Sequence, residues 1–216
     1  LQSPNRATHF KAFMALVEKG DEAKDALEQL FTEGESRMRA RAFWVLTKLP
    51  NGNDYIKTAA TDPDENIRVA AIRAYRNNKM SDVSFLLEMA GDESAQVRRE
   101  VALAIRYTSA PEVWLKLVEG YESGGRWYLE ALGIAAEGFW DDYLPVYLEK
   151  TGSGWMENQE AKDIVWRSRA SNTADLLGKI ILSQPGRNNQ SYYRALDFQS
   201  LEAKNKTLKS LLANAP

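Results

Sequence analysis

Three clusters combine aromatic and basic side chains and offer the best chemistry in this sequence. Tryptophan, tyrosine and arginine are the residue types enriched in binding hot spots, and aromatic rings also stack on apolar faces of sugars. We therefore expect a surface that binds a partner or ligand, formed by Arg126, Trp127, Trp166, Arg167, Arg169, Tyr193 and Arg194. In the opposing interpretation, the aromatic rings pack between helices while the arginines pair with Glu130, Asp163 and Asp197.

A second set of arginines recurs at a regular interval. Arg39, Arg68, Arg98 and Arg126 lie 29, 30 and 28 residues apart. The surroundings agree best in two copies, since DPDENIRVAAIRAY begins at Asp62 and DESAQVRREVALAI begins at Asp92. Arginine near a helix N-terminus opposes the helix dipole, so each needs a carboxylate or carbonyl partner. We expect Asp62, Arg68, Asp92 and Arg98 to form a structural ladder between repeats.

Catalytic groups with a recognisable spacing are scarce. The best carboxylate candidates are Glu130, Glu137, Asp141 and Asp142, and solvated helix faces and helix capping explain all four. The sequence has no cysteine, a single histidine (His9), no glycine-rich phosphate loop and no serine-centred elbow. We therefore expect no catalytic residue, no metal site and no cofactor.

The charge distribution also bears on the partner class. The net charge is −2, and no basic segment gathers the lysines and arginines that phosphate-backbone binding requires. This balance disfavours nucleic acid as a partner. No apolar run approaches the roughly 20 residues of a membrane-spanning helix.

Helices in pairs must position these residues. Apolar residues recur at helical spacing, as in the stripe of Ile67, Ala71, Ala74 and Tyr75 and in its counterpart one repeat later. Asp62 is predicted to cap one helix start, with Pro63 at the first helical position. Breaks such as Gln184-Pro185-Gly186 separate the pairs. The predicted pairs span residues 5–33, 36–61, 64–90, 94–121, 124–150, 157–182 and 189–213.

The repeat resembles a known family. The Asp-Pro-Asp start, with an arginine six residues after the first Asp, is similar to HEAT repeats in their short bacterial form. The segments RWYLEALGIAAEG from Arg126, DIVWRSRA from Asp163 and YYRALDFQ from Tyr192 resemble the HEAT segment of large multidomain bacterial proteins. Those proteins join a sorbosone-dehydrogenase-like β-propeller, a HEAT array and a c-type haem domain. The resemblance implies an extracytoplasmic setting, at the periplasm or cell surface, and a parent protein involved in sugar or polyol oxidation.

The fold class expected is all-α, a right-handed α-α superhelix (a HEAT-like α-solenoid) of about seven helical pairs. Residues 1–216 are expected to form a single repeat domain, and a chain that starts at Leu1 is expected to be a fragment of a larger protein. The expected function is a non-catalytic scaffold that docks a protein or another domain of its parent chain. The alternatives are a HEAT-like enzyme, of the DNA glycosylase or bilin lyase type, and a carbohydrate-binding array.

Overall fold

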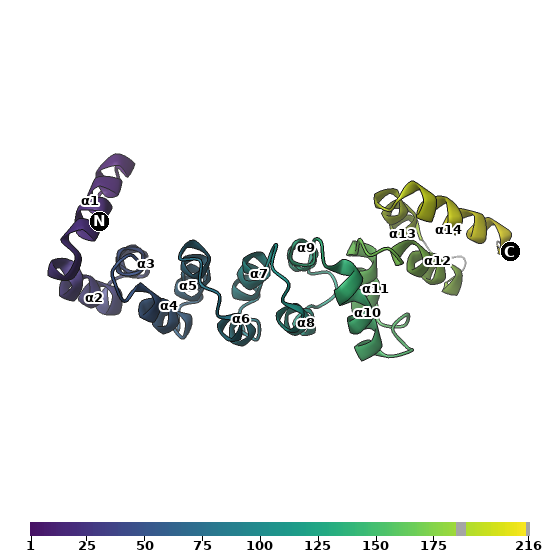
Figure 1. Ribbon diagram of the computed structural model, residues 1–216, viewed down its shortest axis with the longest axis horizontal. Helices are drawn as coiled ribbons and strands as arrows, with labels where there is room; N and C mark the ends of the chain where they lie inside the picture. The colour runs from purple at the N-terminus through teal and green to yellow at the C-terminus, as the bar shows by residue number, and fades with distance from the viewer. Residues whose placement is uncertain (185–188, 215–216) are drawn as a thin grey trace. The chain divides into compact units, whose positions relative to one another are not determined.

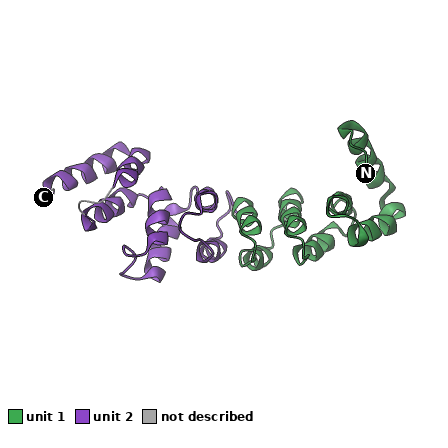
Figure 2. Ribbon diagram, turned by 180° about the vertical axis from the view of Figure 1, so that it is seen from behind, with its two compact units in different colours: residues 1–104 green, residues 105–216 purple. Residues whose placement is uncertain are grey.

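The computed structural model describes residues 1–184 and 189–214, and within these ranges the chain is all-α, as predicted. It divides into two compact units, Leu1–Ala104 and Ile105–Pro216 (Figure 2). Pro185 and Gly186 of the predicted break lie outside the described residues. No helix in the described part of the chain is both long enough and apolar enough to cross a membrane.

Unit 1 consists of helices that pack against their close neighbours in sequence. Along the chain they are α1 (Arg6–Lys19), the 3-10 helix η1 (Gly20–Ala23), α2 (Lys24–Glu33), α3 (Ser36–Leu46), α4 (Gly52–Ala60), α5 (Glu65–Asn77), α6 (Val83–Met89) and α7 (Ala95–Ala104). Helix α5 contacts α3, α4 and α7, and Figure 1 shows α3, α5 and α7 in one row with α2, α4 and α6 in a second. This arrangement is a repeat-like stack in which each helix touches elements one or two places away.

The predicted apolar stripe forms the core of α5. Ile67, Ala71 and Ala74 are completely buried and Tyr75 nearly so. Their spacing places them on one face of α5, which packs against α3, α4 and α7. The sequence periodicity therefore predicted the buried face of this repeat correctly.

The predicted cap of α5 is wrong by two residues. The helix begins at Glu65, and its N-cap is Asp64, whose carboxylate accepts the backbone N–H of Asn66 at 2.9 Å. Asp62 instead accepts the backbone N–H of Asp64 at 2.9 Å. Asp62 also binds Arg39 of the preceding repeat, and this contact holds it in the turn before the helix.

The repeated arginines and aspartates connect successive repeats of unit 1. Arg68 makes a two-pronged contact with Asp92, from Nε to Oδ2 at 2.7 Å and from Nη2 to Oδ1 at 2.9 Å. Arg68 also donates to the backbone carbonyl of Asp62 at 2.9 Å, and Arg98 donates to that of Asp92 at 2.7 Å. Each aspartate is thus held at its carboxylate by the arginine before it and at its carbonyl by the arginine after it.

Unit 2 repeats the helical pairing. Its elements are α8 (Pro111–Glu119), α9 (Arg126–Ala135), α10 (Trp140–Thr151), α11 (Gln159–Arg167), α12 (Thr173–Ser183), α13 (Gln190–Ala195), the 3-10 helix η2 (Leu196–Phe198) and α14 (Leu201–Ala213). Its core centres on Trp114, which is fully buried and donates its indole N–H to the carbonyl of Leu132 at 3.0 Å. The rings of Trp140 and Tyr143 pack on Trp114 with centroid separations of 5.8 and 5.3 Å.

Candidate functional site

The three aromatic and basic clusters lie on three helices of unit 2 that pack side by side. Helix α9 contacts α11, and α11 contacts α13. Since the clusters are far apart in sequence, this packing is what brings them together. Helix α11 is central, with Trp166 and Arg167 near its C-terminal end.

An ion-pair bridge joins α9 to α11. Glu130 accepts a hydrogen bond from Nε of Arg126 at 3.1 Å and another from Nε of Arg167 at 2.8 Å. Helix α9 has a glycine, Gly133, where this bridge crosses it, and a Cβ at that position would overlap the guanidinium of Arg167. The glycine therefore lets Arg167 lie against the helix backbone and reach Glu130.

Two adjoining cavities, of about 330 and 400 Å³, lie on either side of Trp166. Both are lined by Trp166 and Ser191, so we treat them as one surface and call it the Trp166 groove. The indole N–H of Trp166 donates to the carbonyl of Ser191 at 3.1 Å, which fixes the ring between α11 and α13. The guanidinium of Arg126 lies 5.9 Å from the ring centroid of Trp166, and Arg194 lines the far cavity.

The carboxylate of Asp163 lies in the Trp166 groove, and its oxygens are already bonded. It accepts hydrogen bonds from the hydroxyls of Tyr121 and Ser123, at 2.9 and 2.7 Å, and from the amide of Gln159 at 2.8 Å. Burial, together with the bond to Asp163, raises the pKa of Tyr121 well above its ordinary value. Tyr121 therefore remains a neutral hydrogen-bond donor. Its bond, with those from Ser123 and Gln159, holds the Asp163 carboxylate in place in the groove.

Large apolar side chains are exposed in the groove lining or next to its residues in sequence. Trp127, which follows Arg126, is 76% exposed, and Phe198, which lines the groove, is 64% exposed. Tyr193, which precedes Arg194, is 45% exposed. The guanidinium of Arg169 stacks 4.8 Å from the ring centroid of Phe198.

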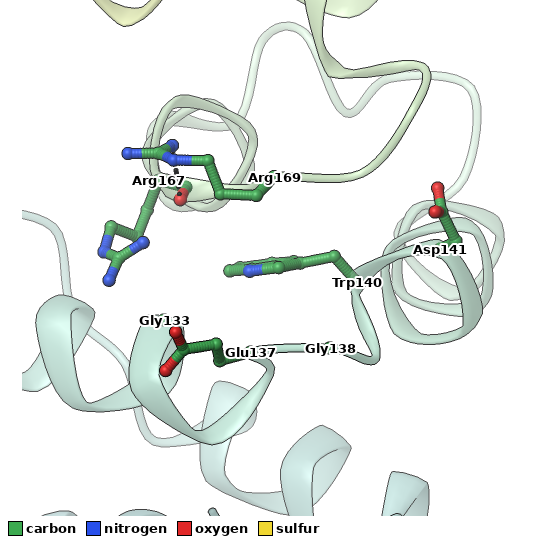
Figure 3. Close-up of a pocket in the computed structure, with 7 residues that line it drawn as sticks. All are labelled: Gly133, Glu137, Gly138, Trp140, Asp141, Arg167 and Arg169. Atoms are coloured by element: carbon green, nitrogen blue, oxygen red, sulfur yellow. Dashed lines mark hydrogen bonds between the residues drawn. The ribbon is translucent and has the colours of Figure 1, made fainter. Parts of the chain in front are cut away.

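A further cavity, of about 480 Å³, lies between α9, the start of α10 and the end of α11. We call it the Trp140 pocket. Its lining residues are Gly133, Glu137, Gly138, Trp140, Asp141, Arg167 and Arg169. Figure 3 shows the Trp140 ring between Arg169 on one side and Glu137 on the other, with the guanidinium of Arg167 near the free edge of the ring.

Charged groups in the Trp140 pocket are perturbed by their surroundings. Burial and the neighbouring guanidinium of Arg167 lower the pKa of Arg169, which donates to the carbonyls of Arg167 and Ser168 at 2.9 and 2.6 Å. Hydrogen bonds from Ser171 lower the pKa of Asp141. The backbone nitrogen of Ser171 lies 2.6 Å from Oδ1 of Asp141. Asp141 is therefore an ionised acceptor at neutral pH.

The structure divides the seven predicted binding residues among these features. Arg126, Trp166 and Arg194 line the Trp166 groove, and Arg167 and Arg169 line the Trp140 pocket. Trp127 and Tyr193 line neither cavity and are exposed. The opposing interpretation holds for Glu130, which pairs with two arginines. Within the described part of the chain it does not hold for Asp163, which is bonded by the uncharged side chains of Tyr121, Ser123 and Gln159. Asp197 binds Lys204 at 2.5 Å rather than an arginine.

The residues of these surfaces that were not predicted from the sequence include Gly133, Trp140 and Phe198. A glycine inside a helix pattern is a signal of close approach and marked Gly133 in principle. Trp140 and Phe198 carry no such signal, because only the tertiary packing places one against a cavity and leaves the other in solvent. Among the described residues, no group of three or more His, Asp or Glu side chains has an arrangement that could hold a metal ion.

The chain matches no family model, and no curated protein matches it.

Proposed function

We propose that this chain is a non-catalytic scaffold, a HEAT-like α-solenoid that binds a segment of a protein in the Trp166 groove. The segment combines acidic residues with aromatic or aliphatic ones. That segment belongs to a partner protein or to another domain of the same parent chain. The observation that carries the proposal is the exposure of Phe198, which lines a groove that also contains Arg126 and Arg194, together with the exposure of Trp127 and Tyr193, the chain neighbours of these arginines.

The apolar part of the argument concerns exposed aromatic area. Isolated exposed apolar residues are ordinary, but a group of large ones beside a groove is typical of interaction surfaces. Trp127 and Phe198 leave most of their rings in water, and covering them would stabilise a complex by roughly 25 cal/mol per Å² of apolar area. These rings are the anchors we expect a partner to cover.

The charges select the partner. Among the described residues that line the Trp166 groove, Asp163 is the only acid, and three hydrogen bonds already occupy its oxygens. The side chain of Arg126 is 70% exposed even though it pairs with Glu130. Arg194 forms no ion pair within the described part of the chain. A segment with Asp or Glu next to its apolar side chains complements this surface.

The finer fold assignment rests on the repeat. Helices that contact neighbours one or two places away, and aspartates bound by arginines of successive repeats, support a HEAT-like stack. The resemblance to multidomain bacterial proteins supports docking between domains as the biological context. We assign no enzymatic activity to this chain.

A peptide library displayed on phage tests the proposal. We expect panning on the immobilised protein to enrich peptides that combine acidic and aromatic or aliphatic residues. Fluorescence anisotropy of an enriched peptide should show at least about a tenfold loss of affinity, or about 1.4 kcal/mol, for Trp127→Ser and for Arg194→Glu. Binding should also weaken as salt is added, because screening reduces attraction between exposed charges.

Two matched variants control for nonspecific effects. Tyr107→Ser removes a ring that is 72% exposed in the same unit but does not line the groove, and Lys179→Glu reverses an exposed charge on α12. Both should bind within about twofold of the unmodified protein. Peptides without an acidic bias, or equal losses in the control and groove variants, would contradict the proposal.

A further inference from the structure

The Trp140 pocket shares no lining residue with the Trp166 groove and offers several hydrogen-bond donors that the described residues do not use. Arg167 donates to Glu130 through Nε, and its terminal nitrogens donate to no described residue. Arg169 uses Nη1 for two backbone carbonyls, which leaves Nε and Nη2. A guanidinium presents its donors in a planar fork that matches a carboxylate.

The indole N–H of Trp140 is a third donor. The Trp140 side chain is only 4% exposed, yet this N–H donates no hydrogen bond to a described residue, whereas those of Trp114 and Trp166 each reach a carbonyl. A buried tryptophan N–H usually finds a partner. Among the described residues, the side-chain nitrogen and oxygen atoms that are fully buried and lack a hydrogen-bond partner belong to His9 and Thr207. The indole nitrogen of Trp140 is not one of them, so it remains accessible, and the Trp140 ring lines the cavity (Figure 3).

The start of α10 adds to this donor surface. Gly138, Trp140 and Asp141 of the pocket lining surround the first turn of this helix, and its N-cap, Phe139, provides no side-chain cap. Unsatisfied backbone N–H groups and the helix dipole favour an anion at such a position.

The pocket also holds acceptors. Glu137 accepts from Arg106 at 3.1 Å, and Asp141 accepts from the backbone N–H and the side chain of Ser171. A carboxylate offers about four acceptor sites, so each of these groups can accept a further hydrogen bond. The charges in the pocket balance. Arg167 and Arg169 line it together with Glu137 and Asp141, so the charged lining residues carry no net charge.

We infer that the Trp140 pocket binds a small hydroxycarboxylate. Its carboxylate accepts hydrogen bonds from Arg167, Arg169 and the indole N–H of Trp140, and its hydroxyl groups donate to Glu137 and Asp141. The two pocket acids would repel a doubly charged anion more strongly than one carboxylate, which favours a ligand with a single carboxylate. A volume of about 480 Å³ accommodates a ligand with one ring.

Quinate, cyclohexanecarboxylate and inositol test this inference because they share a six-membered carbon ring. Cyclohexanecarboxylate lacks the hydroxyl groups of quinate, and inositol lacks its carboxylate. The ¹H–¹⁵N signal of the Trp140 indole, assigned with Trp140→Phe, reports on the pocket directly. We expect quinate to shift this signal with a saturable dependence on concentration, and each of the other compounds to bind at least about tenfold more weakly.

Matched variants locate the binding. Arg169→Gln should weaken quinate binding at least about tenfold, whereas Arg194→Gln, the same charge change in the Trp166 groove, should leave it within about twofold. Unchanged signals of the other indoles would show that Arg169→Gln is folded. Glu137→Gln should weaken the binding of quinate but not that of cyclohexanecarboxylate, because only quinate has hydroxyl groups that donate hydrogen bonds to this carboxylate.

The inference would be overturned by any of four results. These are no shift of the Trp140 signal, equal binding of quinate and either inositol or cyclohexanecarboxylate, equal binding of quinate and inorganic phosphate, or equal losses from Arg169→Gln and Arg194→Gln. Loss of peptide binding to the Trp166 groove would leave these results unchanged, so the two proposals fail separately.

Discussion

Gly133 determines where one arginine can lie. Because it has no Cβ, the guanidinium of Arg167 packs on α9 and bonds Glu130, whose other oxygen is held by Arg126. The helix accepts a residue of poor helix propensity, which costs about 1 kcal/mol relative to alanine, in exchange for this bridge. The preference against glycine inside a helix is therefore overridden where α9 and α11 pack closely.

Gly133→Ala should destabilise the protein by about 1–2 kcal/mol, because the methyl group displaces Arg167 from Glu130. In an Arg167→Ala background the sign should reverse, and the same substitution should stabilise by up to about 1 kcal/mol through helix propensity. Urea denaturation of the four proteins in this double-mutant cycle measures both effects. Destabilisation of equal size in both backgrounds would show that Arg167 is not the obstacle.

Arg68 is a second residue whose geometry matters more than its charge. Its side chain and that of Asp92 are each 8% exposed, and two nitrogens meet two oxygens. Arg68→Lys keeps the charge but loses the fork, so we expect a loss of about 1–3 kcal/mol in urea denaturation. The control is Arg73→Lys in the same unit, where the arginine side chain is 57% exposed and Glu100 is also bound by Arg76. That change should stay within about 0.5 kcal/mol.

At the scale of the element, the starts of the helices depend on side chains from neighbouring repeats. The hydroxyl of Ser36, at the start of α3, donates to Asp64, the N-cap of α5. In the next repeat the hydroxyl of Ser94 donates to Glu65 at the start of α5. The cap of a helix is therefore part of the contact between repeats.

Asp64 gives this contact a pH dependence. The hydrogen bond from Ser36, then that from the N–H of Asn66, lowers the pKa of Asp64 in the folded protein. A lowered folded pKa means that the stabilisation is complete above the ordinary Asp value of about 3.9 and is lost as the pH falls through the folded value. Asp64→Asn, which also caps helices, should match the unmodified protein within about 0.5 kcal/mol at pH 6.

Below about pH 4, the unmodified protein should lose up to about 1 kcal/mol more stability than Asp64→Asn, a small value because the carboxyl is partly exposed. Urea denaturation at a series of pH values measures this difference. Parallel stability curves for the two proteins would mean that Asp64 does not contribute to acid sensitivity.

At the scale of the whole molecule, contacts between helices are local in sequence. In each unit, helices pack on elements one or two places away. A stack with such contacts has a stability that is close to a sum of its repeats and their interfaces, and it need not unfold as one body.

We therefore expect the effect of Arg68→Ala to remain local. Hydrogen exchange should accelerate in α5 and α7, whose contact loses the Arg68–Asp92 pair, while α9 and α12 in unit 2 keep their protection. Faster exchange throughout both units would instead show that the chain unfolds cooperatively.

The sequence alone was sufficient to predict the helices. Each of the seven predicted spans holds two α-helices, with α10 and α12 extending one residue further, because the period of apolar residues reflects the geometry of the backbone. The period of the arginines likewise indicated residues that meet across repeats, since equivalent positions align in a stack. Local patterns did not place the cap of α5, because Asp62 is held by an arginine from another repeat.

Only the tertiary structure decided which of the aromatic and basic residues face a cavity. Trp166 lines the groove and bonds Ser191, Trp127 remains in solvent, and Trp140 is buried while its N–H bonds none of the described residues. Their sequence neighbourhoods are similar, with an arginine or an acid close by. What distinguishes them is the packing of helices from neighbouring repeats, as in the bonds of Trp166 to Ser191 and of Arg167 to Glu130. These partners are 25 and 37 residues apart, so a short stretch of sequence carries no signature of them.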